Sequence, residues 1–311
     1  MKLSKLSFLL IVFSALSFSQ DWKIEPSPVA QDEIQEALIL AEPGDTVLLS
    51  KGIYKLNHGL SLDVDNVSIK GAGMYETILD FSGQETGAQG LLITSDNVLM
   101  QDFAVENAKG DAIKSKGVKN IRFIKVRTEW TNGPDSKNGA YGLYPVESIG
   151  VLIDGCVAIG ASDAGVYVGQ SEQIIVRNTR AEYNVAGIEI ENSYHADVYN
   201  NIATNNTGGI LIFDLPNLPK QGGKFVRVFK NKSFNNNTEN FAPEGNIVGL
   251  VPSGTGLIIM ANRNVEVFEN NFDNNQTVHI GVVAGELESG DENYDPYPKG
   301  CLLYTSPSPR D

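Results

Sequence analysis

The feature that most constrains the fold is a short apolar–polar–apolar triplet that recurs along the chain. The eight triplets begin at Val67, Val98, Ile121, Val151, Ile174, Ala196, Val226 and Val265. Their successive starts are 31, 23, 30, 23, 22, 30 and 39 residues apart. A base period of 22 or 23 residues, with insertions in some turns, is typical of a solenoid in which each turn stacks on the previous one.

A second apolar series runs through the same turns and marks another strand in each. Its members are Leu91, Ile113, Leu143, Val166, Ile188, Ile210, Leu257 and Ile280. Small residues precede several of them, as in AGVYV, AGIEI, GGILI and TGLII. Leucine-rich repeats share this period but need leucine at fixed positions and a helix, and this chain shows neither. Two or three short strands per turn therefore predict an all-β parallel β-helix.

A polar series follows the triplets at a fixed distance. Its members are Cys156, Thr179, Asn201, Asn231 and Asn270, and the pairs Asn205-Asn206, Asn235-Asn236 and Asn274-Asn275 recur likewise. Asparagines stacked in consecutive coils can hydrogen-bond along the axis and satisfy backbone groups at tight turns. We interpret the asparagine-rich positions, and Cys156 with them, as scaffold.

The start of the chain predicts a signal peptide for export, followed by a helix that caps the first coil. Residues 1–19 combine two lysines, an apolar run too short to span a bilayer and small residues before a cleavage point after Ser19, as in a secretory signal peptide. The mature protein is then secreted or periplasmic, with no membrane span. Residues 31–45 predict an amphipathic capping helix, and residues 45–54 a first strand, because an open coil end exposes core and strand edges.

The last residues differ in amino-acid composition from the rest of the chain. Residues 301–311, CLLYTSPSPRD, closely resemble the translation of a sequencing adapter; a natural tail is the alternative. We therefore expect a β-helix domain over residues 20–300, truncated at its C-terminal end. Without Cys301, Cys156 is the only cysteine, which excludes a disulfide framework.

The net charge and the residue types present argue against several classes of binding partner and of catalytic site. The formal net charge of −14 disfavours nucleic acid and anionic membranes. It also disfavours polyanionic sugars unless a divalent cation bridges the two, whereas neutral glycans meet no such barrier. The three histidines lack the spacing of a zinc site, and neither a nucleophile elbow nor a phosphate-binding loop occurs.

The second strand series places one set of side chains on the outer face. Alternation along a strand directs its second and fourth residues outward. The second positions, in coil order, are Lys114, Tyr144, Tyr167, Glu189 and Leu211; the fourth are Lys116, Val146, Gly169, Glu191 and Phe213. Because adjacent coils lie about 4.8 Å apart, these residues form a ladder that runs from basic through aromatic to acidic and apolar. Such mixed ladders also occur on solvated solenoid surfaces.

Aromatic rings flanked by carboxylates and amides suit sugar recognition, since rings stack on sugar faces while hydroxyls need acceptors. The candidates for acid–base work or calcium binding are Glu189, Glu191, Asp163 and Asp214, with Lys114 or Arg127 for charge stabilisation. The candidates for substrate binding are Tyr144, Tyr167, Gln170 and Asn192, with Trp130 and Tyr141 from inserted loops. The inserted loops over residues 128–142, 213–223 and 237–256 either wall a groove or act as spacers between coils.

Longer stretches carry a family resemblance. AEPGDTVLLSKGIY resembles the first coil of pectin-lyase-like right-handed β-helix proteins, and AEYNVAGIEIENS and ATNNTGGILIFDLPNLPKQGG resemble a bacterial family of parallel β-helix repeat-containing proteins. The resemblance covers residues 30–300 and implies a right-handed, single-stranded β-helix and export. It also implies a possible c-type cytochrome-like partner. The signature segments of pectate lyases, polygalacturonases and mannuronan epimerases are absent, so their catalytic residues do not transfer.

Two hypotheses remain open from the sequence. In the first, an exported β-helix protein binds or processes polysaccharide along the outer strand face, as a lyase, hydrolase or epimerase if it is an enzyme. In the second, the protein is a non-catalytic envelope module whose long face docks a protein partner.

Overall fold

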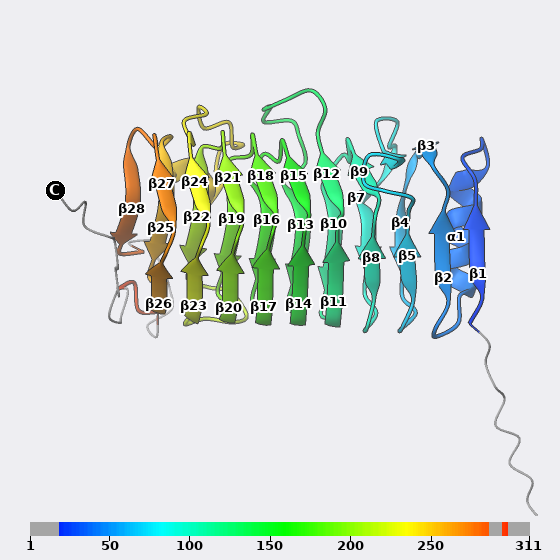
Figure 1. The fold of residues 1–311 in the computed structure, drawn as a ribbon, viewed down its shortest axis with the longest axis horizontal. Coiled ribbons are helices and arrows are strands. Elements are labelled where there is room, and N and C mark those ends of the chain that lie inside the picture. Colours follow the sequence, from blue (N-terminus) through cyan, green and yellow to red (C-terminus); the bar gives the residue numbers. More distant parts are fainter. Residues whose placement is uncertain (1–18, 286–293, 298–311) are drawn as a thin grey trace, which may run out of the picture.

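The computed structural model describes residues 19–285 and 294–297. The chain winds into a parallel β-helix whose coils each contribute one strand to three long sheets (Figure 1). The predicted signal peptide and the adapter-like residues 301–311 lie outside the described residues, apart from Ser19. Within the described ranges, no helix has both the length and the apolar character needed to cross a membrane.

Every strand pairs in parallel with its counterparts in the neighbouring coils. The first sheet contains β1 (Asp21–Ile24), β2 (Thr46–Leu49), β5 (Ser68–Lys70), β8 (Leu99–Gln101), β11 (Lys119–Ile124), β14 (Ile149–Asp154), β17 (Glu172–Arg177), β20 (Tyr194–Tyr199), β23 (Lys224–Phe229) and β26 (Arg263–Phe268). The second contains β3 (Gly52–Lys55), β6 (Thr77–Asp80), β9 (Ala104–Glu106), β12 (Arg127–Glu129), β15 (Val157–Ile159), β18 (Arg180–Glu182), β21 (Ile202–Thr204), β24 (Lys232–Phe234) and β27 (Asn271–Asp273). The third contains β4 (His58–Leu62), β7 (Thr86–Ile93), β10 (Asp111–Lys116), β13 (Tyr141–Val146), β16 (Ala164–Gly169), β19 (Ala186–Glu191), β22 (Gly208–Phe213), β25 (Thr255–Met260) and β28 (Val278–Val283).

Both apolar series predicted from the sequence are confirmed as inward stacks. Along the third sheet, Val166 pairs with Ile188, and Ile188 pairs with Ile210. Along the first sheet, Val151 pairs with Ile174. These side chains are fully buried and form one continuous core through the coils. Apolar side chains at equivalent positions thus stack on one another from coil to coil.

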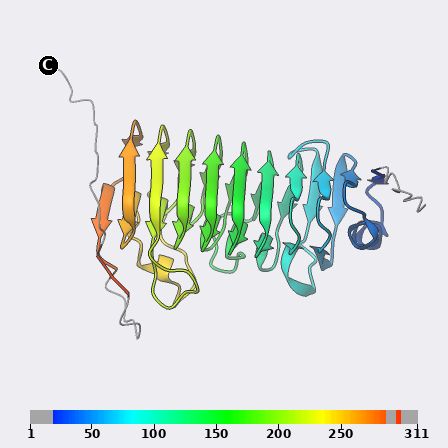
Figure 2. The ribbon, with the colours of Figure 1, turned by 90° about the horizontal axis from the view of Figure 1, so that it is seen from below.

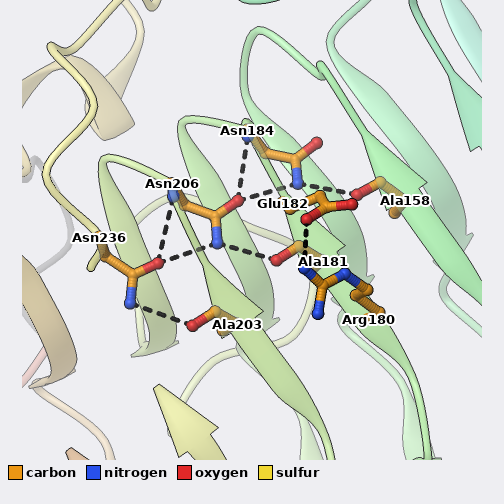
Figure 3. A network of polar contacts seen from close by, with 8 residues as sticks. All are labelled: Ala158, Arg180, Ala181, Glu182, Asn184, Ala203, Asn206 and Asn236. Carbon is orange, nitrogen blue, oxygen red and sulfur yellow. Dashed lines mark hydrogen bonds and ion pairs between the residues drawn. The ribbon is translucent and has the colours of Figure 1, made fainter. Parts of the chain in front are cut away.

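The asparagine ladders are confirmed at two of the turns. At the turn between the second and third sheets, Asn206 Nδ2 donates to Asn236 Oδ1 at 3.0 Å and to the carbonyl oxygen of Ala181 at 3.0 Å (Figure 3). Asn184 repeats this pattern one coil earlier. The residue before each ladder asparagine has positive φ, as at Asn205, which is a backbone conformation that asparagine tolerates. The ladder thus satisfies buried backbone groups where the chain turns.

A helix covers the first coil. The helix α1 (Ala30–Leu40) buries Ile34 and Leu38 against the core and ends earlier than predicted, because Pro43 disfavours helical backbone in the residue before it. The Gln35 side chain both accepts from and donates to the backbone of Ser61 in β4, which satisfies part of that exposed strand edge.

The first strand was predicted incorrectly. A short strand, β1, precedes the helix and pairs with β2. The segment predicted as one strand over residues 45–54 is divided into β2 and β3, because the chain turns there from the first sheet to the second.

Candidate functional site

The predicted ladder on the outer face of the third sheet has the expected register. Lys114 pairs with Tyr144, and the pairing of Leu143 with Val166 sets Tyr144 beside Tyr167. Tyr167 pairs with Glu189, and Glu189 pairs with Leu211. Two residues further along each strand, on the same outer face, Gly169, Glu191 and Phe213 are also neighbours. Basic, aromatic, acidic and apolar side chains therefore follow one another in successive coils, in the order that the sequence repeat predicts.

The ladder is not an open groove, contrary to the expectation. Tyr167 is 5% exposed, Glu189 is 1% exposed and Glu191 is 7% exposed. Two inserted segments, residues 214–223 and 235–254, cover these side chains; both loops project from one side of the coil stack (Figure 2). Alternation predicts only which face of the sheet a side chain occupies, and not whether a loop folds over that face.

The covering segments pack through a second apolar cluster outside the main core. Leu215 comes from the first segment, and Val248 and Val251 from the second; they meet Tyr167 and Phe213 of the sheet. The second segment includes the short 3-10 helix η1 (Ile247–Leu250). Its Asn240 side chain donates to the carbonyl oxygens of Val248 and Val251, both at 2.9 Å. The cover is therefore a folded structure with its own buried contacts.

Two of the predicted site residues hold the cover in place. Asn192 Oδ1 accepts from the Leu215 amide at 2.8 Å, and its Nδ2 donates to the carbonyl oxygens of Leu215 and Lys220. The Asp214 carboxylate accepts from the Gly222 and Gly223 amides at 3.1 and 2.8 Å. These partners make Asn192 and Asp214 supports of the loop over residues 214–223, whereas the sequence analysis made Asn192 a substrate contact and Asp214 an acid, a base or a calcium ligand.

Beneath the cover lies a cavity of about 360 Å³, which we name the tyrosine–carboxyl cavity. It is lined by Ala140, Tyr141, Tyr144, Asp163, Tyr167, Gln170, Glu189, Glu191, Leu215, Leu218, Asn246, Ile247 and Val248. Seven of these, Tyr141, Tyr144, Asp163, Tyr167, Gln170, Glu189 and Glu191, are sequence-predicted candidates. The structure thus gathers most of the candidate residues in a single cavity.

The three tyrosine rings pack against one another. The ring centroid of Tyr141 lies 4.4 Å from that of Tyr144 and 4.7 Å from that of Tyr167. The Tyr167 hydroxyl donates to Glu191 Oε1 at 2.6 Å. Gly169 makes room for this contact, because a Cβ added there would lie 2.3 Å from Tyr167 Oη. Burial is the main cause of the raised pKa of each phenol, and the pKa of Tyr144 reaches about 12. The phenols are neutral hydrogen-bond donors.

The three carboxyl groups share an environment that resists their ionisation. Burial raises the pKa of Asp163 to about 7, although hydrogen bonds from Tyr141 and Asn246 oppose this rise. Burial likewise raises the pKa of Glu191 to about 7, opposed by the Tyr167 hydroxyl. Burial and the nearby charges of Glu191 and Asp163 raise the pKa of Glu189 well above its ordinary value. Asp163 and Glu191 can therefore give or take a proton near neutral pH.

The remaining candidates lie at the edge of the cavity or elsewhere. Lys114 Nζ sits 4.4 Å from the centroid of the Tyr144 ring, beside Asp111. Arg127 belongs to the second sheet, where it is buried and pairs with Glu106 and Glu129. The structure does not bring Trp130 to the cavity: its indole is in the main core and donates to the Ala108 carbonyl oxygen at 2.7 Å. A loop residue can turn into the core, which its position in the sequence does not reveal.

Within the described residues, no group of three or more His, Cys, Asp or Glu side chains is arranged to hold a metal ion. The calcium hypothesis from Glu189, Glu191 and Asp214 therefore gains no geometric support there. Asp214 is engaged by two backbone amides, and Glu191 by a tyrosine hydroxyl. Cys156 is a buried core thiol with a pKa raised to about 12 by burial, in keeping with its predicted scaffold role.

The repeat pattern does not reveal the residues that the cover contributes to the cavity. Asn246 Nδ2 donates to Asp163 Oδ2 at 3.1 Å across 83 positions of sequence. Ile247, Val248 and Leu218 close the cavity with apolar surface. The available signal was the 39-residue step between the last two triplets, which marks the longest insertion but not where its side chains go.

A larger hollow of about 680 Å³ lies on the outer face of the first sheet. It is lined by Gln173, Ile174, Ile175, His195, Asp197, Phe225, Arg227, Asn264 and Glu266. Arg227 and Glu266 are exposed, whereas Asp197 is half-buried and pairs with Arg227. Size alone does not make this hollow a better site, because its charged side chains are exposed to solvent or paired with an opposite charge.

Comparisons with known proteins agree with this architecture. The family model for the right handed beta helix region matches residues 52–218, which is more than half of the chain. The chain therefore belongs to the right-handed β-helix family. The predicted right-handed parallel β-helix is therefore confirmed. No curated protein sequence matches the chain.

Similar solved structures are distant in sequence. One is the pre-mature gene product 12 of bacteriophage phi29, with 14% identity, a TM-score of 0.55, and coverage of 78% of this chain and 39% of that chain. Another is an alginate lyase from Paenibacillus sp. str. FPU-7, with 15% identity, a TM-score of 0.50, and coverage of 84% of this chain and 99% of that chain. This chain thus spans well under half of the phage protein. At these identities the likeness shows the fold alone.

Proposed function

We propose that this protein binds and processes carbohydrate in the tyrosine–carboxyl cavity. The observation that carries the proposal is the set of three buried carboxyl groups, Asp163, Glu189 and Glu191, that line one cavity together with three tyrosines. Burying a carboxyl group is costly, and folded proteins keep such clusters mainly where the perturbed groups have a task. Carbohydrate suits this lining, since sugars offer hydroxyls to the carboxyl groups and apolar faces to the rings.

Acid–base chemistry follows from the same arrangement. Asp163 and Glu191 titrate near pH 7, so one can hold a proton while the other is ionised. Glycoside cleavage uses a pair of carboxyl groups in such complementary states. Hydrolysis, elimination and epimerisation all need a group that gives and a group that takes a proton, and the test below separates the three.

The shape of the cavity supports a short ligand. Its volume of about 360 Å³ lies near the lower end of the range of about 300–1,000 Å³ that small-molecule sites occupy. The cover over residues 235–254 closes the cavity on one side through Asn246 and Val248. We therefore place the end of a glycan chain, rather than its middle, in the cavity. The leader-like residues 1–19 support action outside the cytoplasm, in the envelope or the medium.

The experiment incubates the purified protein with a panel of neutral, amino and acidic oligosaccharides, with calcium and with chelator. Reducing ends, unsaturated products and changes at the sugar C5 distinguish a hydrolase, a lyase and an epimerase. Product formation that disappears in Glu191→Gln supports the proposal. The matched control is Glu147→Gln, because Glu147 is an exposed carboxylate just beyond β13 that pairs with Lys116. Equal activity in the two variants contradicts the proposed site.

One observation favours a second candidate, the docking of a protein partner. The outer face of the first sheet leaves Phe225 43% exposed, with the His195 ring stacked on it at 5.0 Å. Exposed aromatic side chains are enriched where proteins meet. A partner captured by the wild-type protein but not by Phe225→Ser, with no product from any glycan, favours this candidate over the first.

A further inference from the structure

We propose that the ligand of the tyrosine–carboxyl cavity carries a protonated amino group, so that the substrate class is an amino sugar. This inference rests on the proposed function and deepens it, because it specifies which carbohydrate the cavity selects. Two independent features of the cavity carry it: an unpartnered buried oxygen and an excess of acidic groups over basic ones.

The first feature is the Glu189 carboxyl group. Glu189 is 1% exposed and lines the cavity, and within the described part of the chain its Oε2 is buried without a hydrogen-bond partner. A buried polar atom without a partner costs about 1–3 kcal/mol. The neighbouring acids do not share this defect, since Asp163 accepts from Asn246 and Glu191 accepts from Tyr167. A ligand that donates a hydrogen bond to Glu189 Oε2 removes the defect.

The second feature is the charge of the lining. Among the described residues around the cavity, three are acidic and none is basic. The nearest cation in the ladder, Lys114, lies beside Asp111 and over the Tyr144 ring. A cationic ligand thus meets three acids that have no basic side chain beside them in the lining. An ammonium group supplies three donors and a positive charge at one point, which matches both the unpartnered oxygen and the acidic excess.

The tyrosines favour the same ligand. The electron-rich face of an aromatic ring attracts cations within about 6 Å of its centroid. Within the chain itself, Lys114 Nζ occupies such a position at 4.4 Å from the Tyr144 centroid. A sugar that carries an amino group offers both an apolar face for the rings and a charge for the acids.

Two other ligand classes fit less well. A divalent metal ion needs several ligands around one point, and within the described residues the acids are not so arranged. An acidic sugar places its own carboxylate beside Asp163, Glu189 and Glu191, where it further opposes their ionisation and finds no basic partner in the described lining. The amino sugar is the class that reduces the electrostatic cost of the cavity instead of adding to it.

The test compares three trisaccharides that share the same linkage by isothermal titration calorimetry at neutral pH. One is built from glucosamine, one from N-acetylglucosamine and one from glucose. We expect the glucosamine trisaccharide to bind at least about tenfold more tightly than the other two, which is the effect of one charge-assisted hydrogen bond in a buried site. Equal binding of all three overturns the amino-sugar inference but leaves the carbohydrate function standing. No binding of any sugar overturns both.

Two variants test whether Glu189 is the group that causes the preference for the amino sugar. In Glu189→Gln, we expect the preference for the amine to fall to less than about threefold, while the N-acetylated trisaccharide keeps its affinity. In Glu147→Gln, the preference is expected to remain at the wild-type value. Thermal unfolding shows that each variant is folded. A full preference that persists in Glu189→Gln, or one that is lost equally in Glu147→Gln, overturns the assignment to this carboxyl group.

Discussion

The outer faces of the first and third sheets carry ladders of the same residue types, yet they differ in how the charges are arranged. On the first sheet, opposite charges lie side by side in neighbouring coils, as in Arg227 with Asp197 at 2.5 Å and Arg177 with Asp154 at 2.7 Å. On the third sheet, Glu189 and Glu191 lie near Asp163, and no base lines their cavity among the described residues. The first face is in water, whereas the second is covered.

The comparison teaches how to separate scaffold from site in a solenoid. Paired, exposed charges satisfy one another and fit any coil of the stack. Carboxyl groups that are buried together beneath an inserted loop resist ionisation, and burying them costs free energy in the folded protein. The difference lies in the insertions, because the apolar side chains of the loops over residues 214–223 and 235–254 pack on the outer face of the third sheet.

The largest expected effect is the loss of glycan turnover when a buried carboxyl group is replaced by an amide. In Glu191→Gln, the amide cannot exchange a proton at neutral pH, so we expect the rate of glycan turnover to fall by about 10²–10⁴-fold. The measurement is kcat/KM on the glycan that the wild-type protein turns over. The matched change on the first sheet is Asp197→Asn, for which we expect an unchanged rate. Similar losses in both variants contradict the distinction between the two faces.

A second prediction compares the scaffold with the cover. Asn206 links Asn184, Ala181 and Asn236 across three coils (Figure 3). Asn206→Ala leaves several buried polar groups unsatisfied, so we expect the free energy of unfolding to fall by about 2–4 kcal/mol with urea as denaturant.

The matched change in the cover is Asn192→Ala, which removes three bonds to the loop over residues 214–223. We expect a smaller loss of global stability, of about 1–2 kcal/mol, because that loop can loosen without opening the coils. Its KM should nevertheless rise, whereas Asn206→Ala should leave KM unchanged while the protein is folded. The reverse pattern shows that the cover does not shape the site.

The two faces should also respond to pH with opposite signs. The pKa values of Asp163 and Glu191 are raised to about 7 in the folded protein, so the folded state binds more protons than the unfolded chain between about pH 4 and pH 7. The stability that these groups contribute is present below their unfolded pKa values and is lost as the pH rises through about 7. Glu191→Gln should therefore flatten the decline of the unfolding temperature over that window.

The first sheet supplies the opposite case. Burial works against ionisation of Asp154, but hydrogen bonds from Arg177 and Asn178 prevail and lower its pKa. The stability from this group is present above its unfolded pKa and is lost as the pH falls. Asp154→Asn should therefore lower the stability at neutral pH, and the decline of the stability toward acid pH should become flatter. A steeper decline toward alkaline pH in this variant contradicts the sign.

The sequence was sufficient for features that repeat and insufficient for those that occur once. The period gave the pairing of Tyr167 with Glu189 and the stacking of Asn201 on Asn231, because both follow from equal positions in successive coils. The contact of Asn246 with Asp163 depends on how one loop folds in three dimensions, and no repeat encodes it. Trp130 turned out to be a core residue for the same reason.

The smallest effect is expected on the exposed face of the first sheet. Arg227 and Asp197 form a bidentate ion pair, but the Arg227 side chain is about half exposed, and water and salt screen the interaction. We expect Arg227→Gln to lower the free energy of unfolding by about 0.2–1 kcal/mol, and by less at high salt. Urea unfolding at low and high salt measures both values. A loss as large as that of Asn206→Ala, and insensitive to salt, contradicts the comparison, because exposed paired charges would then be as structural as the buried ladder.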